Sequence, residues 1–172
     1  GLLVVSSTGA SPWTVLAQGI SLNIGFSIGS VTLILSIAVL FLWIFLNQKP
    51  GVGTVLNALI IAMMIDLCIT FVPTPESFIS QISLAIIAVI TVGLGGGIYL
   101  VANLGPGPRD GLMVGLQQKT NLPLALVRVT IEITVVSIGW YLGGVVGIGT
   151  LLFAFGIGPT VVLGLFITEK IF

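Results

Sequence analysis

The stretch Gly51-Val-Gly-Thr-Val-Leu-Asn-Ala58 has a similar counterpart 96 residues further along the chain, Gly147-Ile-Gly-Thr-Leu-Leu-Phe-Ala154. At this offset positions 9 to 67 align with 105 to 163 without a gap, and 15 of the 59 positions are identical. The composition alone predicts roughly five or six identities, although apolar sequences inflate such scores. Because glycines and prolines also match in this register, we interpret the chain as two copies of one unit, residues 1–72 and 73–172.

The composition places both copies in a lipid bilayer. Of the 172 residues 56% are hydrophobic and 6% are charged, and the mean hydropathy is +1.27. Soluble domains are usually about a quarter charged. The zero net charge and the lack of a basic patch exclude nucleic acid as a partner. With no His and one Cys, the chain offers no His/Cys metal site and no Cys-His catalysis, so we expect no cofactor and no enzyme activity.

Five segments are long and apolar enough to cross a bilayer of about 30 Å as helices. They lie near residues 24–46, 54–71, 79–102, 122–142 and 150–168. The apolar residues 1–5 are too few to span, and Gly1 aligns with Gly97 inside the third segment. We therefore predict an all-α membrane protein, a six-span helical bundle whose first helix is truncated here.

The number of spans predicts how the two copies are oriented. Three spans in each copy make the copies enter the membrane from opposite sides, as in inverted-topology repeats. The resulting parity puts four basic residues on one side, and the loops of the other side hold Glu76 and no basic residue. The four are Lys49, Arg109, Lys119 and Lys170. By the positive-inside rule both termini are predicted to be cytoplasmic.

Each copy also contains a segment that is too short to span. Residues 8–20 and 104–120 both place Pro near a predicted helix start, and each is predicted to form a half-helix of about three turns. Such a half-helix either lines a cavity within the protein or lies at the membrane interface.

A glycine motif opens the last helix of each copy. Thr as N-cap explains both motifs structurally, while ligand binding by their backbone N–H groups is the functional alternative for Gly51, Gly53, Thr54, Gly147, Gly149 and Thr150.

The second copy also resembles a known family. The run Gly105-Pro-Gly-Pro-Arg-Asp-Gly-Leu-Met-Val-Gly-Leu116, followed by Leu-Val-Arg128-Val-Thr-Ile-Glu132, is similar to the bacterial YczE/YyaS/YitT family of integral membrane proteins. Ser11-Pro-Trp-Thr14 resembles a motif of that family's first half, but has Thr14 where members have an acidic residue. The resemblance implies a multi-pass protein of the bacterial inner membrane and names no substrate.

Four charged residues near or within the membrane form the candidate site. Arg128 and Glu132 are one helical turn apart in a predicted span, and Arg109 and Asp110 lie at the tip of the second half-helix. Charges at membrane depth normally pair or line a pathway. We predict that these four form a cytoplasm-facing cluster, called the charged cluster below. Its arginines could hold a carboxylate or phosphate, and Glu132 could exchange a proton. The structural alternative is a neutral network that pins the half-helix to the fifth span.

These features favour a small-molecule secondary transporter that takes a small anionic or zwitterionic substrate. The alternative is a non-transporting structural or assembly subunit of a membrane complex, with a homo-oligomer or another membrane protein as partner. An intramembrane enzyme resting on Glu132 or Asp110 alone is a distant third.

Four aromatic residues are predicted to be interfacial anchors: Trp13, Trp43, Trp140 and Tyr141. For Asp66 we expect helix capping or snorkelling to the interface.

Overall fold

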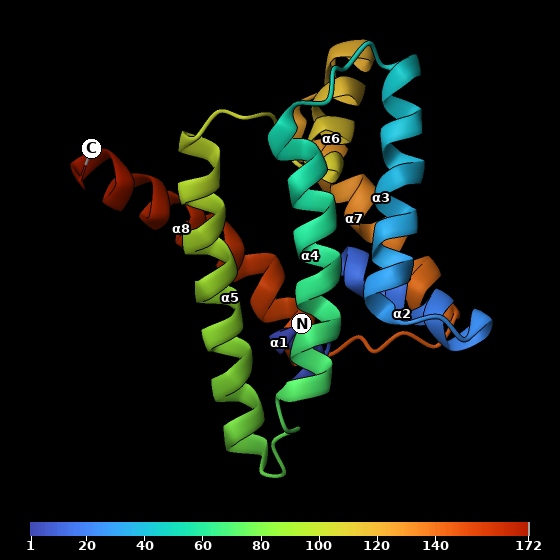
Figure 1. Cartoon of the computed structure of the whole chain (residues 1–172), viewed down its shortest axis with the longest axis vertical. Coiled ribbons are helices and arrows are strands. Elements are labelled where there is room, and N and C mark those ends of the chain that lie inside the picture. Colours follow the sequence, from blue (N-terminus) through green and yellow to red (C-terminus); the bar gives the residue numbers. More distant parts are fainter. Residues whose placement is uncertain (172) are drawn as a thin grey trace. The chain divides into compact units, whose positions relative to one another are not determined.

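The computed structural model describes the backbone of residues 1–171 and the side chains of residues 1–170. Over this range the chain forms eight helices and no strand (Figure 1). The helices are α1 (Leu2–Val5), α2 (Pro12–Ile24), α3 (Ile28–Phe45), α4 (Val52–Phe71), α5 (Phe78–Val101), α6 (Pro108–Thr120), α7 (Leu124–Tyr141) and α8 (Ile148–Ile171). The predicted all-helical fold class is confirmed for this range.

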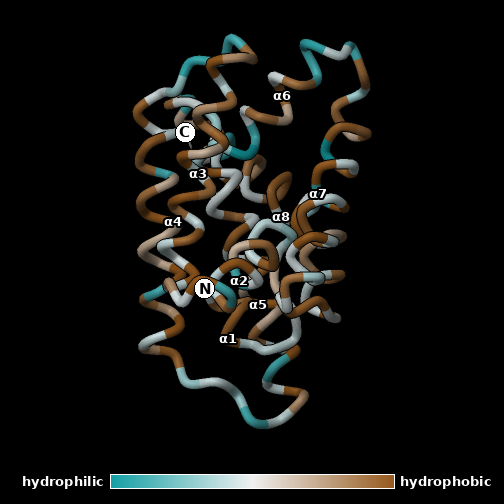
Figure 2. Tube along the Cα trace, turned by 90° about the vertical axis from the view of Figure 1, so that its right-hand side faces the viewer, coloured by the Kyte–Doolittle hydropathy of each residue, from teal (hydrophilic) through white to brown (hydrophobic). Residues whose placement is uncertain are grey.

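Five helices are candidate membrane spans, and they lie where the sequence predicts them. Helices α3, α4, α5, α7 and α8 have spanning windows with mean hydropathies between 1.5 and 2.5. Figure 2 shows hydrophobic colours along these helices and hydrophilic colours at the connections between them. Helices α2 and α6 have 13 residues each, about 20 Å of helix, which is too short to cross the hydrocarbon core.

The offset of 96 residues reappears in the local structure. Helices α2 and α6 begin and end 96 residues apart, as do α3 and α7, and α4 and α8 begin 96 residues apart. Every residue with a positive φ among those described also has its counterpart at this offset. The pairs are Ser7 and Asn103, Gly9 and Gly105, Gly25 and Asn121, and Asn47 and Gly143. Left-handed residues commonly end helices, so the same turns recur in both halves of the sequence.

The chain divides into two compact units. The first contains Gly1–Ser11, Leu67–Asn103 and the chain from Val145 on. Here α5 and α8 pack along each other, with Gly97 against the backbone of Gly164 and Gly93 against Thr160. Small residues at such positions let helix backbones approach closely in a membrane.

The second unit contains Pro12–Asp66 and Leu104–Gly144. Helix α2 packs on α7, and α3 packs on α6 (Figure 1). Gly139 faces the backbone of Val15 and Leu16, and Gly111 faces the ring of Trp43. Because each unit draws segments from both halves of the sequence, the compact units do not follow the repeat boundary. The boundary between residues 72 and 73 stays a prediction.

The prediction that all four aromatic residues anchor the chain at the interface is wrong for two of them. Trp13 and Trp43 are only 8% and 1% exposed and belong to the apolar core of the second unit. The absence of a side chain at Gly111 makes room for the Trp43 ring, whose Nε1 donates a hydrogen bond to the Pro108 carbonyl at 3.0 Å. Trp140 and Tyr141 are exposed, as an interfacial position requires.

Asp66 caps a neighbouring helix. Its Oδ1 accepts from the Gly29 backbone N–H at 2.7 Å and its Oδ2 accepts from Ser27 Oγ at 2.6 Å, so a carboxylate faces the positive N-terminal end of α3. We expect Asp66→Ala to lower the free energy of unfolding by about 1–2 kcal/mol, measured as a lower thermal midpoint in detergent. Glu76→Ala, which removes a carboxylate from the loop before α5, is the matched control. Equal midpoints for the two variants would contradict the capping role.

Candidate functional site

The candidate site lies in the second unit, where α6 begins beside α7. Helix α6 starts at Pro108 after the N-cap residue Gly107, which provides no side-chain cap. Proline suits this position because the first helical N–H has no partner within the helix. Arg109 and Asp110 follow in the first turn, so their side chains stand at the uncapped end of the half-helix.

Arg128 and Glu132 form an ion pair on α7. Arg128 Nε lies 2.9 Å from Glu132 Oε1, and the two side chains are 47% and 22% exposed. The spacing of four residues predicts this contact. Charges within a spanning helix normally pair with each other or line a pathway, so this pair fits both the structural alternative of a pinned network and the candidate binding site. The pair brings a carboxylate and a guanidinium to the helix that packs on α6.

The three other charges of the cluster influence the pKa of Asp110. Burial among protein atoms raises the pKa of its carboxyl; Arg128 and then Arg109 oppose this rise, and Glu132 adds to it. The residue still reaches the surface of the chain. Burial also lowers the pKa of Arg109 to about 10, against the influence of Asp110, so the guanidinium is charged near pH 7. Arg109, Arg128 and Glu132 therefore all lie near enough to Asp110 to influence its pKa.

Asn57 of α4 lies beside the candidate site and was not predicted from the sequence. A Cβ atom placed on Gly107 would lie 3.1 Å from Asn57 Oδ1 and 3.2 Å from Asp110 Oδ2. The amide of Asn57 and the carboxylate of Asp110 therefore flank the same glycine at the start of α6. An uncharged polar residue inside an apolar span was the available indication, because burying an amide in a membrane is costly without a partner.

The first half-helix contributes Trp13 to the same place. The guanidinium carbon of Arg109 lies 5.4 Å from the centre of the Trp13 ring, which is within cation–π distance. The indole Nε1 of Trp13 is buried and has no hydrogen-bond partner among the described residues. Among the described residues, Arg109 forms no hydrogen bond or ion pair. Two donors beside the uncapped end of α6 are thus without an acceptor.

The backbone N–H groups of the two glycine motifs donate within the chain. Gly51 N–H donates to Thr54 Oγ1 and Gly53 N–H to the Leu104 carbonyl, at 3.1 and 2.9 Å. In the other compact unit Gly147 N–H donates to Thr150 Oγ1 at 3.3 Å and Gly149 N–H to the Thr8 carbonyl at 2.8 Å. The two motifs belong to different units, and the first lies beside the segment before α6, where Thr54 Oγ1 donates to the Pro106 carbonyl at 2.7 Å. Their role in ligand binding stays a prediction.

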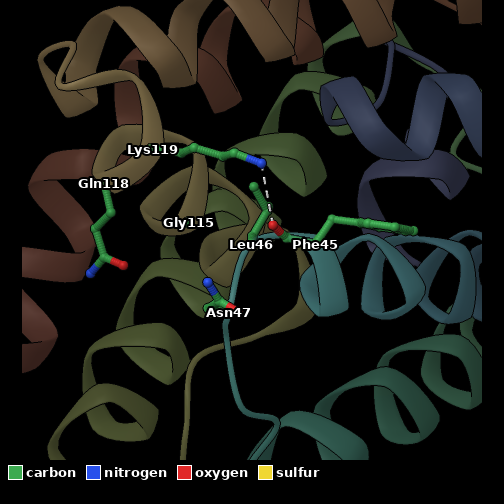
Figure 3. A pocket seen from close by; sticks show the side chains of 6 residues that line it. All are labelled: Phe45, Leu46, Asn47, Gly115, Gln118 and Lys119. Atoms are coloured by element: carbon green, nitrogen blue, oxygen red, sulfur yellow. Dashed lines mark hydrogen bonds between the residues drawn. The ribbon is translucent and has the colours of Figure 1, made fainter.

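A shallow hollow of about 240 Å³ lies at the opposite end of α6. It is lined by Phe45, Leu46, Asn47, Gly115, Gln118 and Lys119 (Figure 3). The Lys119 ammonium donates to the Phe45 carbonyl across it, at 3.4 Å. Lys119 is about 13 Å along the helix axis from Asp110, so this hollow is separate from the charged cluster.

Comparisons with known proteins agree with the resemblance. A model described as "Family of unknown function (DUF6198)" matches residues 1–165. An uncharacterised protein of Haemophilus influenzae is 42% identical over 94% of this chain and 74% of its own length. The uncharacterised membrane protein YczE of Bacillus subtilis is 31% identical over 85% and 68%, and the uncharacterised protein YyaS of the same organism is 28% identical over 88% and 77%. No solved structure matches the chain.

Proposed function

We propose, from the premise that the chain belongs to the DUF6198 family, that this multi-span membrane protein is a secondary transporter for a small anionic or zwitterionic molecule. The binding site is the charged cluster of Arg109, Asp110, Arg128 and Glu132. Its place is the bacterial plasma membrane, with both termini in the cytoplasm. The observation that carries the proposal is that half-helix α6, which begins with Arg109 and Asp110, packs on α7 with its Arg128–Glu132 ion pair, near enough for these charges to act on the Asp110 carboxyl.

The recurrence of helix bounds and turns supports an inverted repeat. Transporters built from such repeats bind substrate where the copies meet, and discontinuous helices supply the binding groups there. In this chain the two half-helices α2 and α6 have equal length, and both contribute to the second compact unit. Each packs on a long helix of the other half of the sequence, α2 on α7 and α6 on α3. This exchange brings the tips of both half-helices to the site.

The ion pair of α7 supplies the step that depends on protons. Glu132 accepts a hydrogen bond from Arg128, so protonating the carboxylate removes the charge that holds the guanidinium. Arg128 is then available to an anionic substrate, since Arg binds carboxylates and phosphates through a planar set of donors. Substrate binding and proton binding at this pair would therefore favour each other.

Replacing Glu132 tests the proposal. Proteoliposomes holding the protein are challenged, under an imposed pH gradient, with a panel of monocarboxylates, amino acids and phosphate esters, and uptake is measured. We expect at least one solute to enter only when the protein is present, and Glu132→Gln to slow that uptake at least about tenfold because it removes the carboxylate paired with Arg128. Glu76→Gln, in the loop before α5, is the matched control.

Two results would contradict transport. One is that no solute of the panel enters faster than in protein-free liposomes. The other is that Glu132→Gln, purified as a folded protein, moves the solute as fast as the Glu76→Gln control does.

Two exposed glycines favour the scaffold alternative. Among the described residues, no atom outside the neighbouring chain of the same helix lies within 4 Å of a Cβ placed on Gly95 or Gly158, so the α5 and α8 surfaces there are open to a close approach by another helix. A non-transporting subunit would use such surfaces to bind a partner helix or a second copy of the chain. Purification in a mild detergent distinguishes the two functions, because a subunit is expected to retain a partner at fixed stoichiometry.

A further inference from the structure

The tips of the two half-helices meet at residues that are counterparts in the repeat. Trp13 and Arg109 are 96 residues apart, and the Arg109 guanidinium lies 5.4 Å from the centre of the Trp13 ring. When two copies are related by a two-fold axis, a residue that contacts its own counterpart lies on the axis. Under the proposed inverted repeat, the contact marks the point where the two copies meet, which is where transporters of this architecture bind substrate.

Both residues of this contact carry donors without a partner among the described residues. The Trp13 side chain is 8% exposed, and its Nε1–H has no acceptor. Arg109 carries up to five donors and makes no hydrogen bond or ion pair among the described residues. The N-terminus of α6, which Arg109 and Asp110 follow, has no side-chain cap and carries the partial positive charge of a helix start. A buried donor without a partner is costly, so these groups point to an acceptor that binds from outside the chain.

We infer that Trp13 Nε1, the Arg109 guanidinium and the N-terminus of α6 together bind an oxyanion of the transported solute, that is, a carboxylate, sulfate or phosphate group. This inference rests on the proposed function and goes further, because it names the chemical class of the ligand and adds Trp13 to the site. Hydrogen bonds from an indole N–H and a guanidinium to a negatively charged oxygen are stronger than those between neutral groups.

The local charges allow an anion to bind here. Arg128 is already paired with Glu132 at 2.9 Å, which leaves Arg109 as the unpaired cation of the cluster among the described residues. Arg109 keeps its positive charge near pH 7, because burial lowers the pKa of its guanidinium only to about 10. Burial raises the pKa of the Asp110 carboxyl, and Arg128 and Arg109 oppose this rise.

The experiment measures binding without transport. The protein is purified in a maltoside detergent, which carries no charge, and its thermal midpoint is followed during titration with sodium acetate, sulfate or phosphate, with sodium chloride at equal ionic strength as reference. A ligand that binds only the folded state raises the midpoint. We expect at least one oxyanion to raise it where chloride does not.

Trp13→Phe keeps the buried ring and removes only its N–H. We expect this variant to bind the oxyanion at least about tenfold more weakly, because a hydrogen bond to a charged group is lost. Trp140→Phe makes the same chemical change at an exposed tryptophan and is expected to bind as the unmodified protein does. Arg109→Gln, which removes the charge, is expected to abolish the response.

Three outcomes would overturn the inference. They are a midpoint that responds to all oxyanions as it does to chloride, an unchanged affinity in Trp13→Phe, and a response to added phosphatidylglycerol alone, which would assign the donors to a lipid headgroup. The proposed function fails separately. Oxyanion binding with no solute uptake in proteoliposomes would refute transport and keep the binding site. Uptake that survives in Trp13→Phe and Arg109→Gln would keep transport and refute the binding site.

Discussion

Gly111→Ala is expected to destabilise the second compact unit strongly, although it adds only one methyl group. The added Cβ would overlap the six-membered ring of Trp43. That ring is 1% exposed and is held by the hydrogen bond from its Nε1 to the Pro108 carbonyl, so it has no free direction in which to move. Helix α6 must shift away from α3, at a cost of about 1–3 kcal/mol or more for an overpacked core.

The measurement is the thermal midpoint in detergent, together with the yield of folded protein. Gly95→Ala is the matched control, because a Cβ at Gly95 meets nothing within 4 Å and alanine favours a helix over glycine. We expect Gly111→Ala to lower the midpoint and Gly95→Ala to leave it unchanged or raise it. If both variants melt at the same temperature, then Trp43 does not hold α6 in the way described.

The spans and half-helices could be predicted from sequence because their causes are local. Long apolar runs form spanning helices wherever a bilayer is the solvent, and Pro12 and Pro108 fix helix starts by lacking an N–H. The offset of 96 residues was visible for the same reason, since glycines at turns and close contacts, such as Gly9 and Gly105, are required by the backbone. Helix existence and length follow from such patterns without knowledge of tertiary contacts.

The surroundings of the aromatic residues could not be predicted in this way. Trp13 and Trp43 lie near helix ends in the sequence, as interfacial anchors do, but their burial depends on helices more than 60 residues away. Trp43 contacts Gly111 and Pro108 of α6, and Trp13 lies beneath Arg109. Nothing in the sequence near either tryptophan indicates these contacts, because they arise only when α2 and α3 pack against the second half of the chain.

Part of the candidate site could likewise be predicted from local spacing, and part depends on tertiary contacts. The Arg128–Glu132 pair follows from a spacing of one helical turn, and its contact is observed at 2.9 Å. The approach of Asn57 to Asp110 beside Gly107 joins residues of α4 and α6, which no helical periodicity relates. Local spacing therefore found the charges, and only the tertiary structure adds the neutral polar side chains Trp13 and Asn57 beside them.

The orientation of the two copies predicts an all-or-none result in labelling. Between Lys49 and Val145 the chain passes through the candidate spans α4, α5 and α7 and through α6. If α6 does not cross, three crossings place the two residues on opposite sides of the membrane. If α6 crosses, four crossings place them on the same side. The 13 residues of α6 extend about 20 Å against a core of about 30 Å, so we expect opposite sides.

Single cysteines introduced by Lys49→Cys and Val145→Cys test this in a Cys68→Ser background, which removes the single native thiol. Both positions are exposed. A membrane-impermeant maleimide should label Val145→Cys in intact cells and Lys49→Cys only in inside-out vesicles. Glu76→Cys, separated from residue 49 by α4 alone, gives the reference for the outer side whether or not α6 crosses. Labelling of Lys49→Cys and Val145→Cys from one and the same side would show that α6 crosses, and the inverted arrangement from which the transport proposal draws its support would then be wrong.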